Sequence, residues 1–242
     1  MRSNIERLFA VLFVVLPPTL ARGADPAPAS GRRAAQDALK PYGALVGEWR
    51  GTGMPERGKT RGAWTESENW AWKLGKETAA LEMTVTKGGK YLKSADLKPG
   101  PEPKTYALDA VLIDGSKRAF TGKGVDKKPL VLTAPEGEGD GVRRITLTPL
   151  HDTRLLMLLE GQYPDKSYHQ LGEVGFTRQG IAFAAGESGP VCIVTEGRGT
   201  MQVAYKGKTY YVCCTGCRDL FKENPEAVLA EAAEREKAKA KR

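Results

Sequence analysis

The chain has 242 residues, of which 40% are hydrophobic, enough to bury the core of one medium domain and one small module. Its 37 lysines and arginines outnumber its 29 aspartates and glutamates, for a formal net charge of +8. Because the two signs are interleaved and form no basic block, the charge indicates a solvated surface. A nucleic-acid partner is therefore not expected.

The beginning of the chain predicts a secretory signal peptide at 1–23. Arg2 and Arg7 precede an apolar run at 8–16, and small residues occupy the two recognition positions of the segment Ala21 to Gly23. The run is about half as long as the roughly 20 residues that a membrane-spanning helix needs. We therefore expect an exported protein, periplasmic or secreted, with no stable membrane anchor.

The next segment, 24–40, predicts a flexible leader. It is rich in proline, alanine and polar residues and has little to bury. One or two helical turns are expected over 34–40, before Pro41, where they would close one end of the domain that follows.

Residues 41–185 predict a domain made of β-strands. Short β-branched, aromatic and alternating stretches are separated by turn signals such as Gly88-Gly89 and Asp114-Gly115, which favour hairpins. An antiparallel up-and-down order is the simplest topology, and so many strands usually close into a barrel because closure removes exposed edges. The expected strands are 46–53, 63–74, 77–86, 90–95, 104–113, 117–123, 129–134, 142–149, 153–160 and 166–178.

The second of these strands concentrates aromatic and acidic residues on one face. Its alternation places Trp64, Glu66, Glu68, Trp70 and Trp72 together. One interpretation is that the tryptophans fill the core of the barrel. The other is a cavity that binds a small apolar ligand, with Glu66 or Glu68 as its polar contact.

Two short motifs at the ends of the barrel segment resemble those of a known family. Gly47-Glu48-Trp49 and Thr177-Arg178 are similar to the Gly-x-Trp and Thr-x-Arg signatures of lipocalin-like barrels, including the nitrobindin branch. The second motif departs from the signature, because Thr177 and Arg178 are adjacent. The resemblance implies a lipocalin-like barrel in which Arg178 packs across Trp49 and seals one end. It also implies that a small apolar ligand or haem is a possible cargo.

A haem would require an axial histidine, and the chain offers two. His151 falls in an expected turn, and His169 on the last expected strand is the better candidate. The sequence shows no nucleophile elbow, phosphate-binding loop or metalloprotease helix. We therefore expect no enzymatic activity.

The four cysteines of the chain are confined to its C-terminal part. Between them, 201–205 and 209–212 alternate like two strands of a hairpin, and Thr215 begins an expected helix. The hairpin would return the first cysteine toward the others. The cluster consists of Cys192, Cys213, Cys214 and Cys217.

Three interpretations of the cysteines remain open. Thiolates at this spacing suit Zn²⁺ or Cu(I), and the binding energy of an ion would stabilise a module whose core is too small to hold its shape unaided. Exported proteins favour disulfides, although adjacent Cys213 and Cys214 cannot both pair locally without strain. A thiol oxidoreductase using Cys214 and Cys217 would need a reactive pair, and no thioredoxin-like βαβ pattern surrounds them.

The residues around the cysteines resemble the YHS and TRASH group of metal-binding domains. The similar stretches are Pro190 to Cys192, Tyr205 to Cys217 and Phe221 to Glu226, and the sequence departs at Ile193-Val194, where Gly-Met often follows the first cysteine. The resemblance implies a module at 190–230 that handles heavy metals in trafficking, resistance or sensing. The ligands that it implies are Cys192, Cys213 and Cys217, with Cys214 as an alternate or fourth ligand.

The remaining residues, 231–242, predict a charged helical tail. Pro225 suits the first position of its helix, and fraying is expected from Lys237 onward. The sequence thus predicts an exported, non-enzymatic protein that binds Zn or Cu(I) through a cysteine module after a barrel. The alternative is a barrel that carries a small apolar ligand or haem, with the cysteines as structural disulfides.

Overall fold

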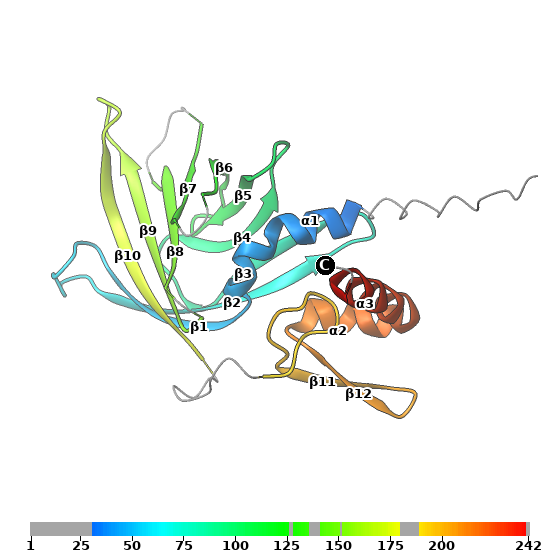
Figure 1. Cartoon of the computed structure of the whole chain (residues 1–242). Helices are drawn as coiled ribbons and strands as arrows, with labels where there is room; N and C mark the ends of the chain where they lie inside the picture. Colours follow the sequence, from blue (N-terminus) through cyan, green and yellow to red (C-terminus); the bar gives the residue numbers. More distant parts are fainter. Residues whose placement is uncertain (1–30, 126–127, 136–140, 151, 180–188, 241–242) are drawn as a thin grey trace, which may run out of the picture.

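A computed structural model of the chain describes residues 31–125, 128–135, 141–150, 152–179 and 189–240. It shows a β-barrel with a smaller module beside one of its ends (Figure 1). The expected signal peptide, His151 and the segment 180–188 lie outside the described residues. No helix in the described ranges is long and apolar enough to cross a membrane.

The barrel is a closed antiparallel meander of ten strands among the described residues, as expected. Each strand pairs with its neighbours in the sequence, and β1 pairs with β10 to close the ring. The strands are β1 (Gly47–Met54), β2 (Trp64–Leu74), β3 (Ala79–Gly88), β4 (Leu92–Pro99), β5 (Thr105–Leu112), β6 (Lys117–Lys123), β7 (Leu130–Thr133), β8 (Arg144–Leu150), β9 (Arg154–Gln162) and β10 (Tyr168–Arg178).

Large apolar side chains fill the core of the barrel. Alternate residues along the strands are buried, as in the pattern of β5, so one face of each strand points to the core. The largest fully buried side chains include Trp49, Trp70, Phe120 and Phe176. Trp70 on β2 therefore fills the core of the barrel, which is the first of the two interpretations of this strand.

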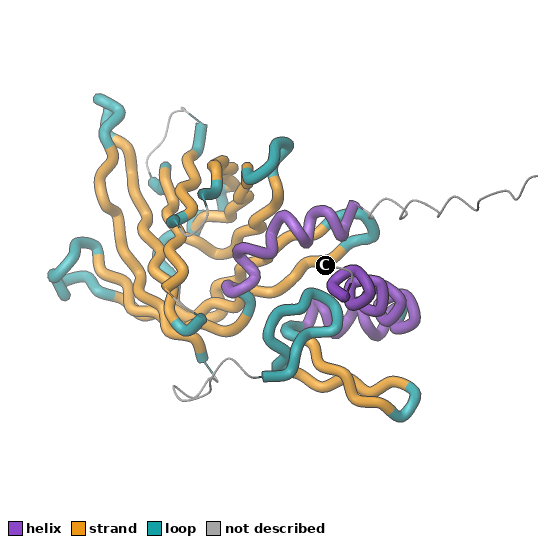
Figure 2. Tube along the Cα trace, in the orientation of Figure 1, coloured by secondary structure: helices purple, strands orange, loops and turns teal. Residues whose placement is uncertain are grey.

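Helix α1 (Gly31–Leu39) and the 3-10 helix η1 (Lys40–Leu45) cover one end of the barrel (Figure 2). Tyr42 packs edge-on against Tyr106 with ring centroids 4.8 Å apart, and Leu39 is fully buried. The helical turns expected over 34–40 are present, whereas the expectation of a flexible leader is wrong for 31–33, which belong to α1. A long-range contact holds this part of the helix: the N–H of Gly31 bonds the carboxylate of Glu77.

The contact that the lipocalin-like resemblance implies is present at the same end. The guanidinium of Arg178 lies 4.3 Å from the ring centroid of Trp49 and donates hydrogen bonds to the carbonyl oxygens of Ala44, Val46 and Asp152. Burial lowers the pKa of Arg178. The side chain thereby joins η1, β1 and the turn before β9.

The C-terminal module contains the expected hairpin and helices: β11 (Met201–Tyr205), β12 (Lys208–Val212), α2 (Thr215–Glu223) and α3 (Pro225–Ala240). Phe221 on α2 packs against Tyr205 and Tyr210 of the hairpin. Helix α3 crosses position 230 without a break. The expected fraying from Lys237 is wrong as far as Ala240, because Lys239 forms ion pairs with Glu196 and Glu236.

The module is docked on the outside of β2. Helix α2 contacts this strand, and a Cβ placed on Gly216 would lie only 1.7 Å from the carbonyl oxygen of Trp72. A second contact joins Arg32 of α1 to Glu231 of α3. The two parts of the chain therefore meet along β2 and α1.

Candidate metal centre

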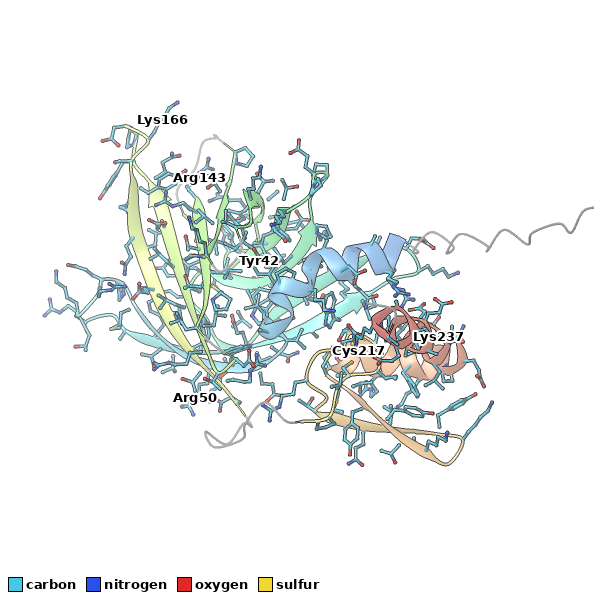
Figure 3. The ribbon with its side chains drawn as sticks, in the orientation of Figure 1. Tyr42, Arg50, Arg143, Lys166, Cys217 and Lys237 are labelled. Atoms are coloured by element: carbon cyan, nitrogen blue, oxygen red, sulfur yellow. The ribbon has the colours of Figure 1, made fainter. Side chains whose placement is uncertain are left out.

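Three thiols meet in the interior of the C-terminal module. The Sγ atoms of Cys192, Cys213 and Cys217 all lie within 4.8 Å of one another, and the distance between those of Cys213 and Cys217 is 3.5 Å. Cys192 and Cys217 are 1% and 0% exposed. The label of Cys217 in Figure 3 marks the position of this cluster beside the barrel.

Three different elements bring these cysteines together. Cys213 directly follows β12, and Cys217 lies in the first turn of α2, four residues later. Cys192 begins a tight turn in which its carbonyl oxygen accepts the N–H of Glu196 at 2.9 Å. The N–H of Ile193 bonds the carbonyl oxygen of Tyr211 at 2.9 Å, so the hairpin carries the first cysteine to the other two.

The donor set fits a soft metal ion. Zn–S bonds of about 2.3 Å in a tetrahedral site place neighbouring sulfurs about 3.8 Å apart, close to the separations in this cluster. All four cysteines are free thiols in the structure. Residues that hold an ion here would be Cys192, Cys213 and Cys217, with Cys214 as a further candidate.

Cys214 occupies a different position from the other three. It is the N-cap residue of α2, and its Sγ accepts a hydrogen bond from the backbone N–H of Trp72 at 3.3 Å. Because β1 begins at Gly47, opposite Trp70, this edge of β2 has no β1 partner at Trp72. The cysteine therefore satisfies a backbone donor that β1 leaves unpaired, and it ties the thiol cluster to the barrel.

The close packing of the thiols shifts their pKa values in opposite directions. Hydrogen bonds from neighbouring thiols lower the pKa of Cys192 and of Cys214. Hydrogen bonds within the same cluster raise the pKa of Cys213 and of Cys217. A cation bound among these sulfurs would favour the thiolate form of its ligands.

A charged cluster fixes the turn that carries Cys192. Glu196 forms ion pairs with Lys40 of η1 and Lys239 of α3, each at 2.8 Å, and its φ of 61° is held in the left-handed region. Hydrogen bonds from these two lysines lower the pKa of Glu196 to about 2. Thr195 of the same turn lies 3.4 Å from the sulfur of Cys213 through its Oγ1.

The two glutamates singled out on β2 lie in the barrel wall with buried side chains. Glu66 accepts a hydrogen bond from the Nε1 of Trp64 at 2.9 Å, and Glu68 accepts one from the Nε1 of Trp70 at 2.8 Å. Burial raises the pKa of Glu66, and it raises the pKa of Glu68 to about 8. The Oε2 atom of Glu68 is buried without a partner in the described part of the chain.

His169 lies near the tip of the β9–β10 hairpin, where its ring stacks on Tyr163 with centroids 4.1 Å apart. Lys166 marks this tip in Figure 3, far from Cys217. Glu66 and Glu68 accept hydrogen bonds from the indole N–H groups of Trp64 and Trp70 on their own strand, β2. The structure thus places the thiol cluster and His169 at opposite ends of the molecule.

Four residues around the thiols escaped the sequence interpretation. The alternation indicates a side chain of Trp72 in the barrel but not that its backbone N–H bonds Cys214; Glu196 and Thr195 lie outside the similar stretches, and Gly216 lies within one without a predicted contact to β2. Backbone donors and packing against another domain leave no local pattern in a sequence.

Comparison with known proteins adds little to these observations. No protein-family model matches the chain, and no curated protein matches it. A crystal structure of Rv2717c from M. tuberculosis is similar over 59% of this chain and 97% of that chain, with a TM-score of 0.38 and 16% sequence identity. The function is therefore inferred from the residues of this chain.

Proposed function

We propose that the chain is a non-enzymatic protein that binds a soft metal ion, Zn²⁺ or Cu(I), through its C-terminal cysteines. The observation that carries the proposal is the group of three free, buried thiols whose sulfurs lie within 4.8 Å of one another. Soft thiolates favour these ions over Mg²⁺ or Ca²⁺, which take oxygen ligands. The ion is the cargo of the protein in this proposal.

The module is proposed to be of the YHS and TRASH type. The similarity of its sequence to that group is supported by a hairpin and helix that bring the first, second and last cysteines together. A role in heavy-metal trafficking, resistance or sensing follows from the same resemblance. Export to the periplasm or outside the cell is proposed from residues 1–23 and would place the protein where it meets incoming metal.

The barrel is proposed to be the body that holds the module. Its core is filled by large apolar side chains, and the module is docked on β2 and α1 rather than suspended on a linker. Cys214 and Gly216 contact the backbone of Trp72. Metal affinity should therefore depend on the barrel as well as on the cysteines.

Anaerobic metal titration of the whole chain tests the proposal. Inductively coupled plasma mass spectrometry and a free-thiol assay should together find one Zn²⁺ or Cu(I) per chain and no disulfide. Cys192→Ser and Cys217→Ser should each abolish tight binding, whereas Ser67→Ala, in the barrel, is a matched control that should leave it unchanged. Thiols that are already paired, with no ion bound after reduction, would refute the proposal.

A further inference from the structure

The sulfur of Cys214 lies among the other thiols, although it stands outside the group of three. Hydrogen bonds link it to the thiols of Cys213 and Cys217, and the same two thiols are hydrogen-bonded to Cys192. The sulfurs of Cys213 and Cys217, 3.5 Å apart, therefore form a central pair. Cys192 and Cys214 are the two flanking sulfurs, each in contact with both members of this pair.

This pattern of contacts approaches a tetrahedral site of four sulfurs. In such a zinc site every sulfur lies about 3.8 Å from each of the others. Within the described part of the chain, only the flanking pair, Cys192 and Cys214, has no hydrogen bond between its members. A small approach of these two sulfurs toward each other would complete the tetrahedron around one ion.

The barrel holds one of the flanking sulfurs directly. The Sγ of Cys214 accepts the backbone N–H of Trp72 at 3.3 Å, on the part of β2 that has no β1 partner. A hydrogen bond of this kind is about twice as strong when the acceptor carries a negative charge, as a metal-bound thiolate does. Donors that bond a metal ligand from behind also fix its orientation. The N–H of Trp72 is therefore placed to support Cys214 as a ligand.

The other flanking sulfur is tied to the barrel through its turn. The carbonyl oxygen of Cys192 accepts the N–H of Glu196, and the carboxylate of Glu196 pairs with Lys40 of η1 at 2.8 Å. Helix η1 covers the end of the barrel. Both flanking sulfurs are thus positioned by contacts with the barrel, whereas the central pair belongs to the end of β12 and the first turn of α2.

We propose that Cys214 is the fourth ligand of a closed, four-thiolate zinc site, and that the backbone N–H of Trp72 stays bonded to this ligand when the ion is present. This inference rests on the proposed function. Four thiolates in a tetrahedral arrangement are a typical ligand set of zinc sites that have no open position. The thiols release their protons to solvent as the ion binds, and no electron is transferred. The barrel thereby contributes a hydrogen-bond donor to the site.

Cys214→Ser distinguishes a ligand from a thiol that only accepts the hydrogen bond. Serine is a favoured N-cap residue, and its hydroxyl can accept the N–H of Trp72, so α2 should form and stay docked on β2. The variant should unfold in urea like the wild type in the absence of zinc. It should bind zinc at least about tenfold more weakly in competition with a chromophoric chelator, since even a group one step removed from the ion contributes about that factor.

Thr215→Ser is the matched control, because it changes the exposed neighbour of Cys214 and no thiol. It should keep the zinc affinity of the wild type. A Cys214→Ser chain whose zinc affinity equals that of the wild type would overturn the inference and leave zinc binding by the other three cysteines intact. X-ray absorption of the zinc-loaded wild-type chain that finds three sulfur ligands in place of four would do the same.

Nuclear magnetic resonance tests the hydrogen bond itself, with cadmium in place of zinc. In the ¹⁵N-labelled whole chain loaded with ¹¹³Cd, the amide proton of Trp72 should show a scalar coupling to the metal, because the path runs through the hydrogen bond and the sulfur of Cys214. The coupling should disappear in Cys214→Ser and persist in Thr215→Ser. A wild-type chain that binds cadmium without this coupling overturns the inference alone, and a chain that binds neither ion overturns the proposed function as well.

Discussion

Gly216→Ala is expected to weaken metal binding without touching a thiol. In the structure the added Cβ would lie 1.7 Å from the carbonyl oxygen of Trp72 and 2.9 Å from its carbonyl carbon. Ordinary contact begins near 3.4 Å, so the start of α2 and strand β2 must separate by more than an ångström. The obstructing atom belongs to the strand backbone and cannot rotate away.

The expected magnitude follows from two opposing effects. Alanine has a higher helix propensity than glycine by about 1 kcal/mol, which alone would stabilise α2. Forced separation of packed groups costs about 1–3 kcal/mol, and metal sites tolerate errors of only about 0.2 Å in ligand distances. The net result should be a lower free energy of unfolding and at least a roughly tenfold loss of zinc affinity, because Cys217 moves with the helix.

Urea unfolding and competition against a chromophoric zinc chelator measure the two quantities. Gly175→Ala is the matched control, because a Cβ at that exposed strand position has nothing within 4 Å. It should change neither stability nor zinc affinity by a comparable amount. A Gly216→Ala chain with wild-type or higher stability and unchanged zinc affinity would refute the docking of α2 on β2.

Three further substitutions probe buried or clustered charge. Glu68 keeps its proton in the folded chain up to its pKa of about 8, so its contribution to stability is greatest below about pH 4.5 and decreases toward pH 8 by at most about 5 kcal/mol; Glu68→Gln should remove this slope in urea titrations, and an unchanged slope would contradict it. The pKa of Glu196 is lowered to about 2 by Lys40 and Lys239, so its contribution is present above about pH 4.5 and lost toward pH 2. Glu196→Gln should therefore cost about 1–2 kcal/mol at pH 7 and little at pH 2; an equal effect at both would exclude the ion pairs as its source. Arg178→Lys should lower the free energy of unfolding by about 2–4 kcal/mol, since a lysine cannot bond three carbonyl oxygens and cover the indole together; a wild-type melting curve would contradict this role.

The strands of the barrel could be predicted because their signals are local. Alternation along each strand and turn residues such as Gly88-Gly89 and Asp114-Gly115 mark positions that the structure confirms. Gly88, Gly89 and Gly115 all have positive φ values there. Strand ends differ by a few residues, since hairpin tips are decided by pairing across strands and not by composition.

Residues 31–33 of α1 could not be assigned to a helix from the sequence for the opposite reason, although turns over 34–40 were expected. These residues are polar, and nothing local predicts a helix there. The residues that hold it, Glu77 and Glu231, lie far along the chain. An isolated helix of this length is unstable in water, so tertiary contacts decide whether it forms.

The cysteine spacing indicated which residues could meet, but it could not indicate how differently they are placed. Cys213 and Cys214 are neighbours in the sequence, yet one joins the buried triad and the other bonds the edge of β2. A hydrogen bond from the Cys213 thiol lowers the pKa of Cys214, so the two sulfurs remain close although their other partners differ. The sulfur of Cys214 is thus one of several contacts between the two parts of the chain, together with Gly216 against Trp72 and the ion pair of Arg32 with Glu231. A metal-bound thiolate can accept a backbone N–H hydrogen bond, so the contact with Trp72 leaves Cys214 able to serve as a fourth ligand and would make the barrel part of the shell around the proposed ion.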